Sequence, residues 1–314
     1  MTAVETPVAT PPAPQPAGRA GFRLETVSEW TKLRSIRSTW ICLAIIVVLS
    51  IGLSALVCFA QAKHWTVACG DRLTFDPVSA SQIGALLSQF VVGVLGALVI
   101  TSEYATGLIR TTFATVPRRT TVLGAKALVV SVVILVVSEI TIFISFLVGQ
   151  SVLTAMGGKV YPSAAAFEAK VAPFVGRHLS SCPTIPMSRL PIPVANFSTP
   201  GALRALILGG IYLTILTLVA VGFGVILRHT AGTISLFVGV LLILPLLIQL
   251  LPSNWSGPIA KYLPNGLGQA MTSPNGLNYD GNPLMSPWTA LVILVIYVVV
   301  VLGVGATLLN RRDA

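Results

Sequence analysis

The chain has 314 residues, of which 54% are hydrophobic and 10% charged, and its formal net charge is +10. A water-soluble domain of this length has no core large enough to bury so much apolar surface, so a soluble globular protein is excluded. The Lys and Arg residues are scattered between apolar runs and form no single basic face. This scatter argues against a nucleic-acid partner and favours a lipid bilayer with anionic headgroups.

The first 39 residues precede the first long apolar run. Residues 1–20 are mostly Pro, Ala, Thr and Val, and this composition predicts a disordered tail. A signal peptide is not expected, because the first long apolar run begins only at Trp40. Residues 21–39 predict an interfacial amphipathic helix whose flanking arginines extend toward the headgroups. Its apolar side holds Phe22, Trp30, Leu33 and Ile36. The alternative is a charged juxtamembrane stretch without a special role.

Six apolar runs then follow, and about 20 residues at about 1.5 Å each span the ~30 Å hydrocarbon layer. The predicted fold is an all-α integral membrane protein with six transmembrane helices. The transmembrane domain covers residues 40–309 and the tail residues 310–314. Trp40 lies at the first boundary, where its ring suits the headgroup level. The six runs cover residues 40–60, 82–101, 127–149, 205–227, 234–251 and 288–309.

Basic residues near the spans set the expected orientation. They concentrate before the first span, between the second and third spans and in the tail, so both termini are predicted to be cytoplasmic. The external loops are then residues 61–81, 150–204 and 252–287. The second is long and Pro-rich, with a weak helical pattern at 164–175, and its role stays open. The third could dip back into the outer leaflet.

The four cysteines divide by environment. Cys42 and Cys58 lie in the first span and are expected to be buried as small apolar residues. Cys69 and Cys182 fall in external loops, where an oxidising compartment would let them pair, so they are a candidate disulfide. Sequence does not show whether their Cα atoms approach within the ~7 Å that a bridge requires. Non-reducing mass spectrometry of protein from its native envelope tests the pair.

Motifs for catalysis are missing from the sequence. There is no GxxxxGK[ST] loop, no HExxH or CxxC spacing and no GxSxG elbow, so neither ATP hydrolysis, nor a metal site, nor a hydrolase is expected of this chain. The exception among the spans is Glu139, near the middle of the third. A carboxylate there costs about 2.5–3.5 kcal/mol on insertion scales, so it should face protein or water. It marks either a polar point on a transport path or an interhelical hydrogen bond.

The connection between the second and third spans is the densest polar stretch. It predicts a short amphipathic helix that ends near Pro117, which does not continue a helix easily. Its apolar residues would seat in a cleft while its arginines pair with acidic groups or headgroups. Such a composition is typical of a docking element. The apolar residues are Leu108, Ile109 and Phe113, and the arginines are Arg110, Arg118 and Arg119.

Three segments carry a resemblance: SEWTKLRSIRSTW before the first span, EYATGLIRTTFATVPRRTTVLGAK between spans two and three, and LRHTAG between spans four and five. In this order they resemble the permease subunits of type 2 ABC exporters, particularly actinobacterial ones. The resemblance implies a multi-pass protein of the bacterial cell membrane that pairs with an identical or paralogous permease. It also implies a separate cytoplasmic ATPase that holds the ATP and Mg, so this chain binds no cofactor.

The same resemblance implies a coupling helix between spans two and three that seats in a groove of the ATPase. The residues it assigns there are Glu103, Tyr104, Gly107, Arg110, Thr111 and Thr112. Arg118 and Arg119 would flank the headgroup boundary, and plain anchoring is the competing interpretation for this pair. The alternative function is an ATP-independent transporter or a membrane-anchored sensor or assembly protein. The sequence does not identify a transported substrate.

Overall fold

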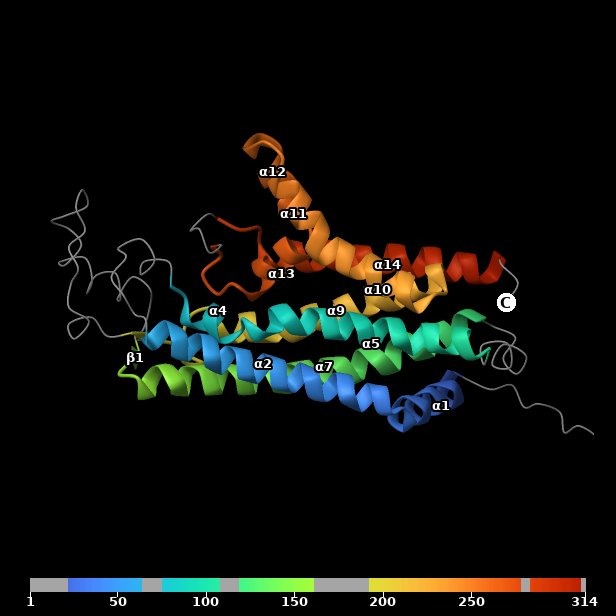
Figure 1. The fold of residues 1–314 in the computed structure, drawn as a ribbon, viewed down its shortest axis with the longest axis horizontal. Helices are drawn as coiled ribbons and strands as arrows, with labels where there is room; N and C mark the ends of the chain where they lie inside the picture. Colours follow the sequence, from blue (N-terminus) through green and yellow to red (C-terminus); the bar gives the residue numbers. More distant parts are fainter. Residues whose placement is uncertain (1–21, 64–74, 108–118, 161–191, 278–282, 312–314) are drawn as a thin grey trace, which may run out of the picture.

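The computed structural model describes residues 22–63, 75–107, 119–160, 192–277 and 283–311, which form a bundle of long helices (Figure 1). These residues include six helical stretches long and apolar enough to cross a membrane, which confirms the predicted all-α membrane fold. The six are α2 (Arg37–Lys63), α5 (Gly84–Thr106), α7 (Arg119–Ala155), α9 (Ala202–Leu227), the continuous run of α10 (Thr230–Val238), η2 (Gly239–Ile243) and α11 (Leu244–Gln249), and α14 (Pro287–Arg311).

Four shorter helices and one pair of short strands complete the described residues. They are α1 (Phe22–Ser35), α4 (Pro77–Ser81), α12 (Ser253–Ala260), α13 (Pro264–Thr272) and a two-residue parallel pair, β1 (Lys159–Val160) with β2 (Pro193–Val194). α1 and the last turn of α14 lie at the same end of the bundle, as an even number of spans requires (Figure 1). The tail 1–20, the pattern at 164–175 and both loop cysteines fall outside the described residues.

α9 is the central helix of the bundle, with 18 of its 26 residues buried. It packs against α5, α7 and α14, and small residues permit the close approach. A Cβ added at Gly96 of α5 would lie 2.5 Å from the Thr217 carbonyl oxygen of α9, and one at Gly224 of α9 would collide with Ile100 of α5. Interior apolar side chains of the same helices, Leu206, Leu213 and Leu216 among them, form the main core.

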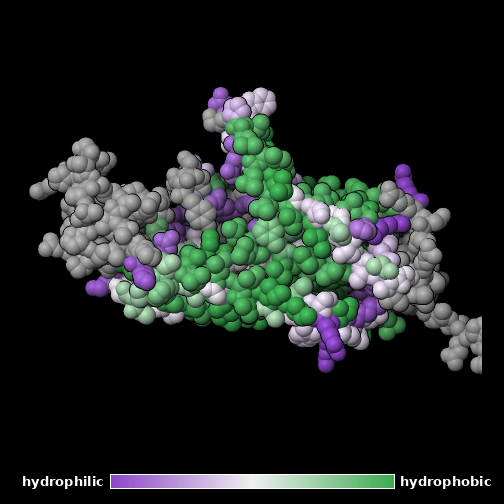
Figure 2. All heavy atoms as spheres, in the orientation of Figure 1, coloured by the Kyte–Doolittle hydropathy of each residue, from purple (hydrophilic) through white to green (hydrophobic). Residues whose placement is uncertain are grey.

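The outer surface of the bundle is apolar around its middle. On the face drawn in Figure 2 a belt of hydrophobic residues separates hydrophilic residues at the two ends. α14 contributes exposed valines, Val299 at 64% exposure among them, and α11 contributes Leu246 and Leu247. In water this surface would be unfavourable, whereas lipid tails match it.

Several helices are longer than the apolar runs predicted. α7 has 37 residues, about 55 Å at 1.5 Å per residue, against a predicted span of 127–149. α5 continues past residue 101 to Thr106. The reason is that hydropathy marks only the lipid-matched part, while the backbone hydrogen-bond ladder continues through polar ends. The predicted N-terminal helix forms as α1, but only Leu33 of its four apolar residues is buried.

The fifth span is broken by Pro245. A proline has no N–H to donate to the carbonyl four residues earlier, which is that of Leu241, and this region adopts the wider π-helix η2. Beyond it, α11 and α12 lean away from the bundle (Figure 1). α13 returns to pack on α9 and α14, burying Leu267 and Met271. Part of the connection 252–287 therefore folds back against the spans. Its external placement and its entry into the leaflet stay predictions.

Candidate functional site

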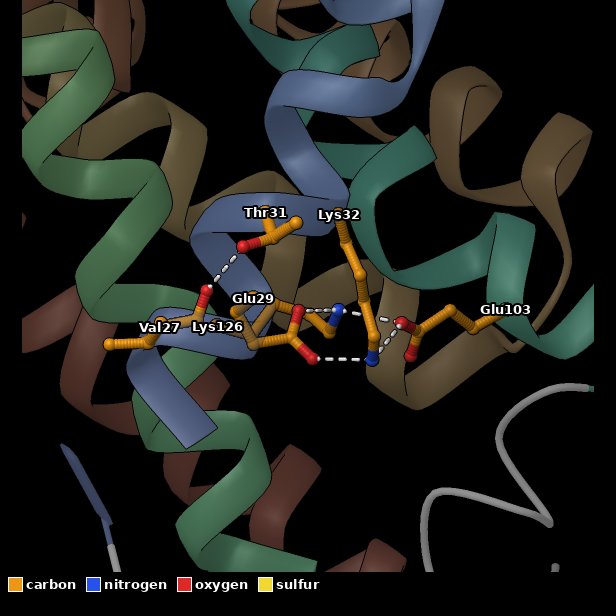
Figure 3. Close-up of polar contacts among 6 residues, drawn as sticks. All are labelled: Val27, Glu29, Thr31, Lys32, Glu103 and Lys126. Atoms are coloured by element: carbon orange, nitrogen blue, oxygen red, sulfur yellow. Dashed lines mark hydrogen bonds and ion pairs between the residues drawn. The ribbon is translucent and has the colours of Figure 1, made fainter. Parts of the chain in front are cut away.

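Four charged side chains from three helices meet at the α1 end of the bundle (Figure 3). The Lys126 ammonium of α7 lies 2.5 Å from Glu29 Oε2 of α1 and 3.0 Å from Glu103 Oε1 of α5. The Lys32 ammonium of α1 lies 2.7 Å from Glu29 Oε1 and 3.2 Å from Glu103 Oε1. Glu29, Lys32, Glu103 and Lys126 are called the charge cluster below.

The charge cluster is largely withdrawn from water. Glu29 and Lys126 are each 3% exposed and Glu103 is 8% exposed, while the Lys32 side chain keeps 39% of its surface. Burial alone raises the pKa of Glu29, but Lys126 and Lys32 outweigh it and hold that pKa below its ordinary value. Burial lowers the pKa of Lys32, yet Glu29 and Glu103 leave it raised overall. Both groups are therefore stabilised in their charged forms.

The ion pairs of the charge cluster join α1 to both ends of the connection between α5 and α7. Glu103 is in the last turn of α5, which ends at Gly107 in a left-handed conformation, φ +71°, that suits glycine. Lys126 is two turns into α7, which begins at Arg119. The predicted coupling residues Arg110, Thr111 and Thr112 lie outside the described residues, and so does Arg118, which was predicted to flank the headgroup boundary. Glu103 and Tyr104 thus belong to the spanning helix itself, and Lys32 joins Glu103 to α1.

The LRHTAG segment meets the same end of α5. Arg228 ends α9 with a left-handed backbone, and its guanidinium lies 5.3 Å from the centre of the Tyr104 ring. The Thr230 hydroxyl donates to the Thr101 hydroxyl of α5 at 2.9 Å. His229 caps α10 by accepting from the Gly232 N–H. Each of the three sequence segments that carried the resemblance therefore contributes contacts around the end of α5.

A cavity of about 910 Å³ lies between α1, α2, α5 and α7, beside the charge cluster. Apolar side chains of α5 and α7, including Leu95, Val99 and Val130, line its inner part. The lining from α1 is mixed: it includes Ser28, Thr31 and Ser35, the charged Glu29 and Lys32, and the apolar Leu33. Among the described residues no group of three or more His, Cys, Asp or Glu side chains could hold a metal ion.

Glu139 faces α9 from the middle of α7. A Cβ placed on Gly210 of α9 would collide with the Glu139 carboxyl group, and the neighbouring Ser138 hydroxyl lies 3.3 Å from the Gly210 carbonyl oxygen. Glu139 Oε2 is buried without a hydrogen-bond partner among the described residues. The carboxyl group therefore lies against α9, and both interpretations of its role stay predictions.

Of the residues predicted at the headgroup boundary, Trp40 lies near the α1 end of the bundle. Trp40, 57% exposed in the first turn of α2, donates from its indole N–H to the Arg34 carbonyl at 2.9 Å. Sequence reasoning missed Glu29 as a site residue. It used Lys32 and Lys126 only as basic residues that indicate which side of the membrane is cytoplasmic. The signal available was the Glu29–Lys32 spacing, because an i,i+3 pair shares one helix face.

The fold and this site define a multi-pass α-helical membrane protein whose polar segments converge at one end of the bundle. Residues 27–176 match the family described as ABC-2 family transporter protein. Over that stretch, which contains the whole charge cluster, the chain is similar to this family, and the match supports a membrane permease of an ABC transporter. No curated protein matches the chain significantly.

Proposed function

We propose that this chain is the permease subunit of an ATP-driven ABC exporter in a bacterial cell membrane. It forms the translocation pathway, and a separate cytoplasmic ATPase binds the ATP and Mg. The observation that carries the proposal is the charge cluster, which ties both ends of the α5–α7 connection to α1. The family match over residues 27–176 supports the same class.

The proposed coupling step is mechanical. The ATPase holds the connection through Arg110, Thr111 and Thr112, and its movement displaces the ends of α5 and α7. Because Glu103 and Lys126 are paired with α1, that helix moves with them and pulls on α2 across the short break at Ile36. Buried ion pairs suit this task, since separating one partner leaves an uncompensated charge.

A second permease, identical or paralogous, completes the proposed pathway. The least buried spans support this arrangement: α14 and the α10–α11 run expose apolar faces that a partner or lipid must cover.

The cytoplasmic placement of both termini stays part of the proposal. So does the transport role of Glu139, which Glu139→Gln tests: unchanged transport with unchanged pH dependence rules out an ionic role.

Co-purification from native membranes tests docking. Wild-type chain should recover an ATPase, and Arg110→Glu should release it because the charge at the docking segment is reversed. Arg311→Glu, a matched reversal at the end of α14, should retain the ATPase. Recovery of no ATPase with wild-type chain would sink the exporter proposal and favour the ATP-independent alternative.

A second experiment separates docking from coupling. Lys126→Met removes the central cation of the charge cluster but leaves the connection's own sequence intact. The variant should still recover the ATPase while transport-linked ATP hydrolysis in reconstituted vesicles falls at least tenfold. Normal coupling in a stable Lys126→Met protein would show that the charge cluster does not transmit the movement.

A further inference from the structure

Glu139 is the only Asp, Glu, Lys or Arg residue within the six apolar runs of the sequence. None of these runs therefore supplies a basic side chain that could neutralise its carboxyl group. Neither carboxyl oxygen has a hydrogen-bond partner among the described residues. A charge at membrane depth is costly, and such residues pair with another group or face a polar path. The apolar runs thus leave this carboxyl group without a counter-charge.

The carboxyl group of Glu139 lies at the border between the buried and exposed faces of α7. On one side Ser138 and Ile142 are buried, and on the other Val136 and Ile140 are more than half exposed. Glu139 itself is half-buried, and of its two oxygens only Oε2 is fully enclosed. Oε1 therefore keeps accessible surface beside side chains that face lipid. A molecule dissolved in the bilayer has access to this oxygen.

Two aromatic side chains lie one helical turn further along the same side of α7. Phe143 follows Glu139 by four residues, a spacing that places both on one face of the helix. Side chains in an α-helix lean toward its N-terminus, which brings the Phe143 ring toward the level of Glu139. Phe197 is 47% exposed and packs on Phe143 with ring centroids 6.1 Å apart. Aromatic faces attract cations and also pack against apolar groups.

We propose that the face formed by Glu139, Phe143 and Phe197 binds a hydrophobic organic cation that enters from the bilayer. The positive nitrogen lies at Glu139 Oε1, and aromatic or alkyl substituents pack on the two phenylalanine rings. The carboxylate repels an anionic amphiphile, and a neutral one leaves the carboxylate charge uncompensated. Hydrophobic cations as the transported class rest on the exporter proposed above, whereas binding to this chain requires no ATPase.

Equilibrium binding to the full-length chain in phosphatidylcholine nanodiscs tests the site. The probe is radiolabelled benzyldodecyldimethylammonium, a permanent cation that carries an aromatic ring and an alkyl chain. Uptake beyond that of empty nanodiscs should saturate at a single site per chain. A neutral analogue with carbon in place of the nitrogen should compete about tenfold less well, because it lacks the charge. Uptake that does not saturate, or equal competition by the neutral analogue, overturns the proposal.

Two matched pairs of variants localise the binding. Glu139→Gln keeps the shape of the side chain and removes its charge, so affinity should fall about tenfold, whereas Glu5→Gln, before the first span, should change nothing. Phe143→Leu should weaken binding about threefold, while Phe59→Leu on the exposed face of α2 should not. Unchanged affinity in Glu139→Gln contradicts the proposal. The competition result on wild-type chain stands independently of how the variants fold.

The cation site and the exporter fail separately. Saturable binding that depends on Glu139, without recovery of an ATPase from native membranes, keeps the site and removes its role in ATP-driven export. Recovery of the ATPase without such binding removes the site and keeps the exporter. With both subunits in vesicles, the probe should stimulate ATP hydrolysis by the wild-type complex and not by the Glu139→Gln complex. Binding without stimulation overturns the substrate class.

Discussion

The Asn265 side-chain amide donates a hydrogen bond to the Leu241 carbonyl at 2.6 Å. This is the carbonyl that Pro245, four residues later and without an N–H, leaves without its α-helical donor. The pair joins α13 to the break in the fifth span, so the connection that contains α13 supplies a donor to a carbonyl that lacks its α-helical partner. A carbonyl at membrane depth without a donor would be costly.

Asn265→Ala should lower the free energy of unfolding by about 1–3 kcal/mol, because the Leu241 carbonyl loses its donor. Thermal unfolding in detergent micelles measures it, with the exposed Asn254→Ala as control. In a Pro245→Ala background the backbone N–H returns, so the same Asn265 change should cost less. Equal losses in both backgrounds would show that the amide does not compensate for the proline.

Gly210→Ala should destabilise the chain by about 1 kcal/mol, because the new methyl group displaces the end of the Glu139 side chain between α7 and α9. Gly303→Ala is the matched control: nothing lies within 4 Å of a Cβ there, and the change should be neutral or stabilising by about 0.5–1 kcal/mol. Adding Glu139→Ala should rescue Gly210→Ala in thermal unfolding. Without rescue, the steric contact is not the cause.

Lys126→Met should cost about 3–5 kcal/mol, since Glu29 Oε2 and Glu103 lose their shared buried cation. Lys261→Met removes an exposed lysine and should change stability little. Combining Lys126→Met with Glu29→Gln should cost less than the sum of the single changes, because the second removes the stranded charge. Additive losses in unfolding experiments would disprove direct coupling of the pair.

The acid sensitivity of the charge cluster follows from the lowered pKa of Glu29. A carboxyl whose folded pKa is depressed contributes stability above its unfolded pKa, ordinarily 4.5, and loses it as the pH falls through the lower folded value. Wild-type chain should therefore lose stability steeply below about pH 4.5, whereas Glu29→Gln should be less stable near neutrality and flatter in acid. Unfolding midpoints between about pH 7 and pH 3 measure this, and parallel curves would refute it.

Sequence reasoning predicted the spans well because hydropathy is a local property. A run such as 288–309 is apolar all round, and only a spanning helix satisfies its backbone in lipid. The end of α5 was predicted too early, at residue 101, because the hydropathy falls there, whereas α5 continues to Thr106 and ends at Gly107. Exact helix ends were not, because α7 continues helical hydrogen bonding well past its apolar part.

Tertiary structure alone decided which polar residues act together. Glu29 and Lys126 lie 97 positions apart in the chain, and no periodicity connects them. Their pairing depends on how α1, α5 and α7 pack, and so does the cavity beside them. The sequence by itself determined how many times the chain is able to cross a bilayer, since each crossing is a property of about 20 consecutive residues. The charge cluster required the fold, because an ion pair depends on distance in space and a sequence records only distance along the chain.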